Sequence, residues 1–120
     1  MIKVYIAGAI TPTGKGNHAI EYLSNVREGI RAAVELLKRG YAPFCPHIDL
    51  HYILSLYPGE EITSEMIYEL SREWLSACDV VFLLPNAENS VGWAKERKLA
   101  ESLNIPIVLS IEEIKEVVKR

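Results

Sequence analysis

The segment Ser90-Val91-Gly92-Trp93-Ala94-Lys95-Glu96 directly follows the most apolar run of the chain. Ser90 is a favourable N-cap for a helix, and the free backbone amides of a first helical turn bind anions such as phosphate. Helical side chains lean toward the N-terminus, so we expect Glu96 to lie over Gly92 and Trp93. Gly92 has no side chain and leaves room for a ligand there. The segment therefore predicts an anion-binding helix end beside a carboxylate, with a capped helix and a solvated glutamate as the alternative interpretation.

The elements that must position this segment follow from the pattern of apolar residues. Strands are predicted at residues 2–7, 41–45, 80–84 and 106–109, and helical periodicity predicts helices between them and after the last strand. Strands and helices that alternate in this way form a parallel sheet with helices on both faces. We therefore expect one domain over residues 1–120 with an α/β, three-layer, Rossmann-like or flavodoxin-like fold and a parallel sheet of four to five strands.

Apolar residues at helical spacing predict the face that each helix buries. For the first helix, which Gly40 ends, they are Ile20, Leu23, Val26, Ile30, Ala33, Val34 and Leu37. For the second, which Thr63 or Ser64 caps, they are Ile67, Leu70, Trp74, Leu75 and Cys78. For the terminal helix, which Ser110 caps, they are Ile111, Ile114, Val117 and Val118.

Three loops leave the carboxyl ends of the predicted strands, after Ala7, after Cys45 and after Leu84. Ligands of open parallel sheets bind beyond these ends, where the strand order reverses. The connection over residues 47–61 has no clean period and is long, which is often a sign of function. We therefore expect the site to be built from these loops.

Three stretches resemble the nucleoside 2-deoxyribosyltransferase superfamily, nearest to its (2′-deoxy)nucleoside 5′-monophosphate N-glycosidase-like members. They are Tyr5-Ile6-Ala7-Gly8, Trp74-Leu75-Ser76-Ala77-Cys78-Asp79-Val80-Val81 and Ser90-x-Gly92-x-x-x-Glu96. The resemblance covers most of the chain, and the last stretch is the most specific.

The resemblance implies that Glu96 is a nucleophile that attacks the anomeric carbon of a sugar and that Tyr5 orients it. A carboxylate suits this chemistry because the transition state is oxocarbenium-like and can be captured covalently. Serine at position 90 implies a hydrolase that holds a 5′-phosphate. The expected substrate-binding residues are Ser90 and Gly92 together with Gly8, Ala9, Ile10 and His47.

The sequence departs from the family pattern at two places. Ser71 stands where family enzymes usually carry an aspartate, the candidate acid for the leaving base, and a hydroxyl cannot donate a proton as a carboxylic acid does. His47 or Asp49 is a candidate to supply that acid instead. Ala9 stands where the hydrolases tend to have serine, and Thr11 or Thr13 could compensate.

We therefore expect an N-glycosidase that acts on a nucleoside 5′-monophosphate. The alternatives are a deoxyribosyltransferase that exchanges bases and a nucleotide-binding module without catalysis. The stretch Gly8–Gly16 has the wrong spacing for a P-loop, and Cys45–His51 matches no standard zinc site, so we expect no metal and no cofactor.

The net charge of −3 and the scattered basic residues argue against nucleic acid as a partner. The chain lacks an apolar run of the roughly 20 residues that span a bilayer, and no signal peptide is expected. Cys45 and Cys78 read as buried, reduced thiols, which favours the cytoplasm. A chain of 120 residues has few residues with which to close its own pocket, and we therefore expect at least a homodimer.

Overall fold

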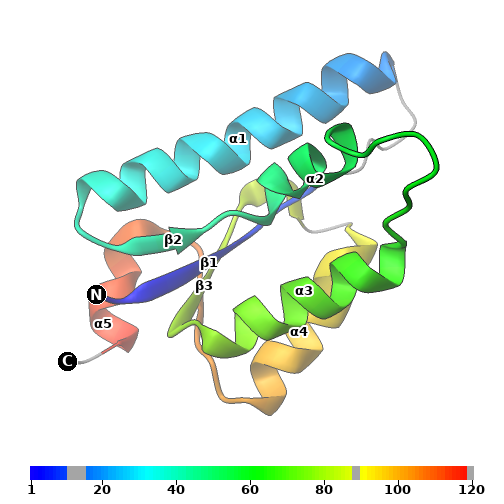
Figure 1. Ribbon diagram of the computed structural model, residues 1–120. Coiled ribbons are helices and arrows are strands. Elements are labelled where there is room, and N and C mark those ends of the chain that lie inside the picture. The colour runs from blue at the N-terminus through cyan, green and yellow to red at the C-terminus, as the bar shows by residue number, and fades with distance from the viewer. Residues whose placement is uncertain (11–15, 88–89, 119–120) are drawn as a thin grey trace.

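A parallel sheet of four strands forms the centre of the protein (Figure 1). The computed structural model describes residues 1–10, 16–87 and 90–118, and the side chains of all of these except Leu50 and Val91. The strands are β1 (Lys3–Ala7), β2 (Ala42–Phe44), β3 (Val80–Leu83) and β4 (Ile107–Val108), in the order β2-β1-β3-β4. The expected α/β fold is confirmed, with four strands.

Helices cover both faces of the sheet and make the fold three-layered (Figure 1). They are α1 (His18–Lys38), α2 (Leu50–Leu54), α3 (Ser64–Ala77), α4 (Val91–Ser102) and α5 (Ile114–Val117). Side chains of β1 alternate between the faces, so Val4 and Ile6 pack with α1 and α5. Tyr5 and Ala7 pack with α3 and α4.

The strand order reverses at β1, which positions the site. The chain passes from β1 to β2 on one side and then crosses to β3 on the other. Ala7, at the end of β1, pairs with Leu83 at the end of β3. The loops after these two strands therefore leave the sheet side by side, where ligands of such folds bind.

Helix α1 corrects one sequence-based expectation. Its fully buried residues are Gly29, Ala32 and Leu36. Four residues of the predicted stripe are exposed, at 67% for Ile20, 63% for Leu23, 39% for Ile30 and 59% for Leu37. Val26, Ala33 and Val34 of the predicted stripe are partly buried, and Ala33 packs against the core, so the buried face of α1 is shifted relative to the prediction.

Three further differences concern local structure. Trp74, expected in the buried stripe of α3, is 46% exposed and stacks on Phe44 with ring centroids 4.8 Å apart. The aperiodic connection after β2 contains a 3₁₀ turn, Pro46–Asp49, followed by α2. The terminal helix α5 is short and begins after Glu113. The Ser110 hydroxyl donates to the Glu113 carboxylate and caps no helix through its side chain.

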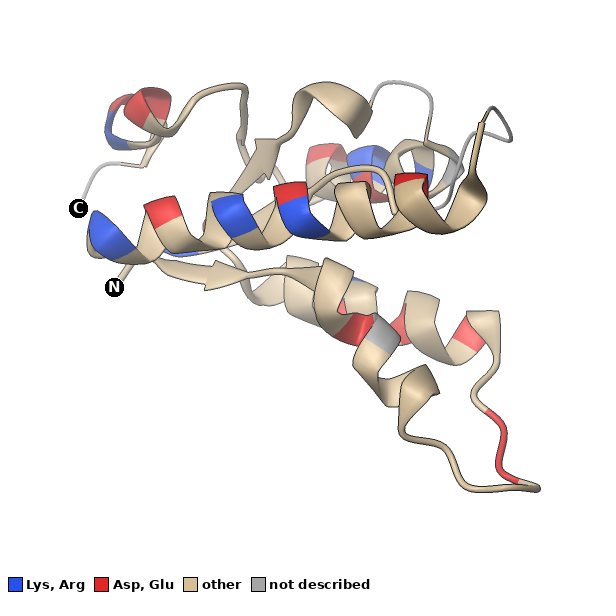
Figure 2. Ribbon diagram, turned by 90° about the horizontal axis from the view of Figure 1, so that it is seen from above, with Lys and Arg blue, Asp and Glu red and all other residues tan. Residues whose placement is uncertain are grey.

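Charged residues mix on the surface in Figure 2, where Lys and Arg alternate with Glu along α1. Among the described residues, none of the helices has the length and apolar character needed to cross a bilayer. Asp79, directly before β3, accepts a hydrogen bond of 2.8 Å from the backbone N–H of Lys3 and so joins the start of β3 to β1.

Candidate active site

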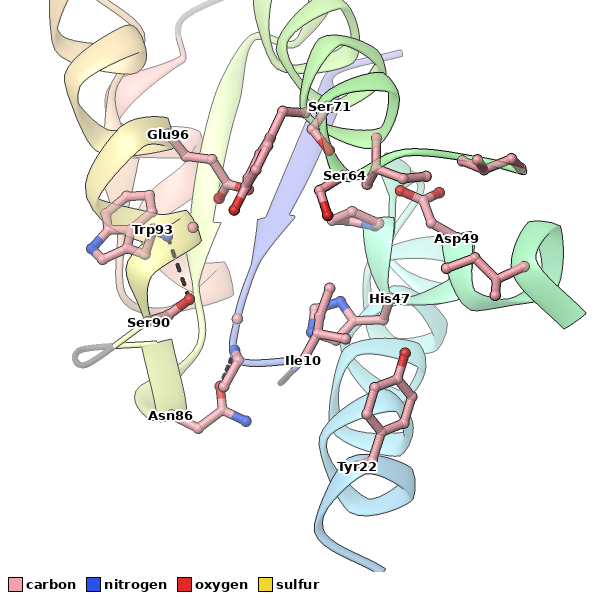
Figure 3. Close-up of a pocket in the computed structure, with 18 of the residues that line it drawn as sticks. Ile10, Tyr22, His47, Asp49, Ser64, Ser71, Asn86, Ser90, Trp93 and Glu96 are labelled. Carbon is pink, nitrogen blue, oxygen red and sulfur yellow. Dashed lines mark hydrogen bonds between the residues drawn. The ribbon is translucent and has the colours of Figure 1, made fainter. Parts of the chain in front are cut away.

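A cavity of about 560 Å³ opens at the carboxyl ends of β1 and β3 (Figure 3). Its volume falls within the range of small-molecule sites. The loop after β1, the 3₁₀ turn after β2, the start of α3 and the first turns of α4 supply its walls. The cavity brings together seven of the residues expected at the site: Gly8, Ala9, Ile10, His47, Ser90, Gly92 and Glu96.

The carboxylate of Glu96 lies in the wall formed by α4 and is hydrogen-bonded to β1. The Tyr5 hydroxyl donates to Glu96 Oε1 over 3.1 Å. Tyr5 is fully buried beneath the cavity and does not line it. Burial raises the pKa of Glu96 to about 7, and the bond from Tyr5 opposes this rise. Glu96 therefore changes charge near neutral pH.

Ser71 extends this arrangement toward α3. Its side chain is buried and also lines the cavity. Burial raises the pKa of Tyr5 far above its ordinary value, the charge of Glu96 raises it further, and a hydrogen bond from the Ser71 hydroxyl lowers it. Tyr5 thus stays a protonated donor to Glu96, with Ser71 beside it.

The first turn of α4 forms an end of the cavity, as the sequence predicted. Ser90 is the N-cap, and its hydroxyl accepts from the backbone N–H of Trp93 over 3.4 Å. Ser90, Gly92 and Trp93 all line the cavity. None of the described lining residues is Lys or Arg, so an anion would be held by neutral donors such as helix-end amides, hydroxyls and the Asn86 side-chain amide.

Asn86 ties the loop after β3 to the loop after β1. Its Oδ1 accepts a hydrogen bond of 3.0 Å from the backbone N–H of Ala9. Gly8 permits this close approach, because a Cβ there would lie 2.6 Å from Leu84 Cδ1 and 3.2 Å from Asn86 Oδ1. The sequence analysis expected a loop after Leu84 at the site but singled out no residue in it before Ser90. The position of Asn86 just beyond a buried strand was the available signal.

His47 lies in the cavity wall across from α4 (Figure 3). Its side chain is fully buried against α1, where a Cβ on Gly29 would overlap the imidazole ring. Nδ1 lies 3.6 Å from Cys45 Sγ, and Nε2 has no hydrogen-bond partner among the described residues. Burial lowers the pKa of His47 to about 4, with a weaker opposing effect of the Ala9 backbone. The imidazole is therefore neutral at physiological pH.

Asp49 ends the same 3₁₀ turn and lines the cavity. The residue is only 8% exposed, and its Oδ2 has no hydrogen-bond partner within the described part of the chain. Burial raises its pKa above the ordinary value. The cavity thus holds two carboxyl groups on different walls, the buried Asp49 and the partly buried Glu96.

Other residues line the cavity as well, and two expected residues cannot be placed in it. Tyr22, Ser64 and Tyr68 also line the cavity, although the sequence placed none of them in the site and indicated Ser64 only as a possible helix cap. Thr11 and Thr13, considered as replacements for a serine at position 9, lie outside the described residues. Over residues 1–10, 16–87 and 90–118, no group of three or more His, Cys, Asp or Glu side chains could hold a metal ion.

Comparison with known protein families gives one match. The model of a domain of unknown function, DUF4406, matches residues 2–109. The chain belongs to this family. The matched part of the DUF4406 chain includes all four strands and every described residue that lines the cavity. No curated protein matches the DUF4406 chain.

Proposed function

We propose that this DUF4406 protein is a hydrolase of the N-glycosidic bond of a nucleoside 5′-monophosphate, releasing the free base and (deoxy)ribose 5-phosphate. The observation that carries the proposal is the partly buried Glu96 carboxylate in a cavity wall, held by the Tyr5 hydroxyl at 3.1 Å. The resemblance to the nucleoside 2-deoxyribosyltransferase superfamily supports the same assignment for both residues.

In the proposed first step, the Glu96 carboxylate attacks the anomeric carbon while the bond to the base breaks. The product is a glycosyl ester of Glu96, which water then cleaves at the anomeric carbon. Tyr5 donates a hydrogen bond to one carboxylate oxygen and so directs the other toward the sugar. The elevated pKa of Glu96, about 7, means that burial has already removed part of the water around the nucleophile.

The N-terminus of α4 is the proposed phosphate site. The amides of its first turn, together with the Ser90 hydroxyl, would bind the 5′-phosphate close to the carboxylate of the same helix. Gly92 supports this placement, because open space lies beside its backbone and a Cβ there would meet only Ser90 Oγ, at 3.7 Å.

Ser71 favours one competing function. A hydroxyl stands where the superfamily usually has an acid, which would suit a nucleotide-binding module without catalysis. Base exchange between nucleosides, the transferase alternative, uses the same Glu96 and differs in the group that accepts the sugar. The three functions therefore have to be separated by their products.

The test is product analysis by chromatography after incubation with ribo- and deoxyribonucleoside 5′-monophosphates and with the free nucleosides. We expect wild-type protein to release free base from a monophosphate and Glu96→Gln to release none. Glu101→Gln is the matched control, because Glu101 lies on the same helix and forms an exposed ion pair with Arg97. Base exchange would identify a transferase, and nucleotide binding without any product would identify a binding module.

The proposal also covers the oligomeric state of the protein and its location in the cell. We propose a homodimer that forms through the apolar residues left exposed on α1, among them Leu23, Ile30 and Leu37. We also propose a cytoplasmic location, because Cys45 and Cys78 are both free and buried.

A further inference from the structure

Cleavage of an N-glycosidic bond leaves negative charge on the base, which a general acid relieves by donating a proton. The usual position for this acid holds Ser71, whose hydroxyl cannot donate a proton as a carboxylic acid does. The question of which group replaces it rests on the proposed function. The candidate acids are the titratable groups that line the cavity or lie beneath it.

Two of these groups are poor proton donors. The imidazole of His47 is neutral because burial lowers its pKa to about 4. The phenol of Tyr5 is engaged with Glu96, and burial raises its pKa far above the ordinary value. Glu96 itself must be ionised to attack the sugar. Among the carboxyl groups that line the cavity, Asp49 remains.

Asp49 has the placement that an acid requires. It enters the cavity from the turn after β2, whereas Glu96 enters from α4, so the two carboxyl groups flank the space between them (Figure 3). Its side chain is 8% exposed, and Oδ2 finds no protein partner among the described residues. A buried carboxyl oxygen without a protein partner is costly, so Oδ2 requires a contact with a ligand or with water.

We propose that Asp49 is the general acid that protonates the leaving base and, in the second step, the base that activates water. As the bond from the anomeric carbon to the base breaks, the Asp49 carboxyl proton passes to a ring nitrogen of the base. The Asp49 carboxylate then takes a proton from water while the water oxygen bonds to the anomeric carbon. Glu96 departs as a carboxylate, and Asp49 is protonated again.

This assignment predicts the pH profile. The productive state has Glu96 ionised and Asp49 protonated, so activity falls at low pH, where both carboxyl groups are protonated, and at high pH, where both are ionised. The charge of Asp49 also acts on Tyr5 and Cys45, both of which burial keeps protonated through neutral pH. His47 is already neutral there. The profile of kcat/KM should therefore be bell-shaped.

The deciding experiment compares two substrates in Asp49→Asn. One is the nucleotide that the wild type cleaves fastest. The other is its analogue with an activated base, methylated at N7 for a purine or fluorinated at C5 for a pyrimidine, which needs less help from an acid. We expect kcat/KM to fall by about 10²–10⁴ on the ordinary nucleotide and by much less on the activated one. On the activated substrate, activity should rise through about pH 7 and then level off, because only Glu96 still titrates.

Glu65→Gln, an exposed carboxylate at the start of α3, is the matched control and should behave as the wild type does. Equal losses on both substrates would overturn the inference and make Asp49 a binding or structural residue. Unchanged activity in Asp49→Asn would overturn it as well. Either result leaves the proposed function standing as long as the wild type releases base. A wild type that cleaves no substrate would refute the proposed function and the acid together.

Discussion

An ionised carboxylate at the position of Glu96 lowers the free energy of unfolding of the protein. Burial raises its pKa from 4.5 in the unfolded chain to about 7 in the native protein. Between these values the native state holds a proton that the unfolded state has released, so the free energy of unfolding falls as pH rises. Each pKa unit corresponds to roughly 1.4 kcal/mol, and partial exposure of the side chain reduces the effect, which leaves about 1–3 kcal/mol.

Glu96→Gln should therefore stabilise the protein in a pH-dependent way. At about pH 8 the variant removes a buried charge, and the free energy of unfolding should rise by about 1–3 kcal/mol. At about pH 4 the carboxyl is protonated in both states, and the difference should nearly vanish. Urea unfolding of wild type and variant at the two pH values measures this. If the free energy of unfolding of the variant were lower by the same amount at both pH values, Glu96 would be shown to stabilise the fold.

At the scale of elements, α1 has two faces that serve different purposes. The face toward the sheet carries Gly29, Ala32 and Leu36, all buried. The absent side chain of Gly29 makes room for the His47 ring, so the helix and the 3₁₀ turn fit together through one small residue. Gly92, in α4, has open space beside it and faces the cavity.

These two helical glycines should respond in opposite ways to replacement by alanine. Gly29→Ala should lower the free energy of unfolding by about 1–3 kcal/mol through overpacking against His47, despite a gain in helix propensity of up to about 1 kcal/mol. Gly92→Ala should leave stability equal or slightly higher but weaken nucleotide binding, because its methyl group enters the cavity. Urea unfolding and calorimetric titration with a nucleoside 5′-monophosphate separate the effects. Unchanged binding by Gly92→Ala would contradict the proposed phosphate site.

At the scale of the whole molecule, the outer face of α1 presents an apolar stripe. Leu23, Ile30 and Leu37 recur every seven residues, a spacing that keeps side chains on one side of a helix. Their exposed fractions are 63%, 39% and 59%. A second copy of the chain would bury such a stripe with the same stripe of its own, as a two-fold symmetric dimer requires.

The double variant Leu23→Glu/Leu37→Glu should therefore be a monomer. Sedimentation velocity at micromolar concentration should show a dimer for the wild type and a species of half its mass for the variant, with unchanged circular dichroism. Leu109→Glu, at a residue that is 69% exposed beyond β4, should remain a dimer. A monomeric wild type, or dissociation by the control as well, would refute the α1 interface.

The fold class, the order of elements and the helix that carries Ser90 and Glu96 were determined by the sequence itself. Apolar periodicity and capping residues report on short windows of chain, and these windows contain enough information to assign strands and helices. The pairing of Tyr5 with Glu96 was expected from a family resemblance, since nothing in a local pattern joins residues 91 positions apart.

Only the tertiary structure decided which side chains are buried and what burial does to them. Helical spacing marked the stripe from Ile20 to Leu37 for the interior, but the structure buries the face with Gly29, Ala32 and Leu36, where Gly29 leaves room for the His47 ring. The sequence left His47 and Asp49 as equal candidates for the acid. Burial then lowered the pKa of the imidazole and raised that of the carboxyl, because removal from water disfavours the charged form of each group.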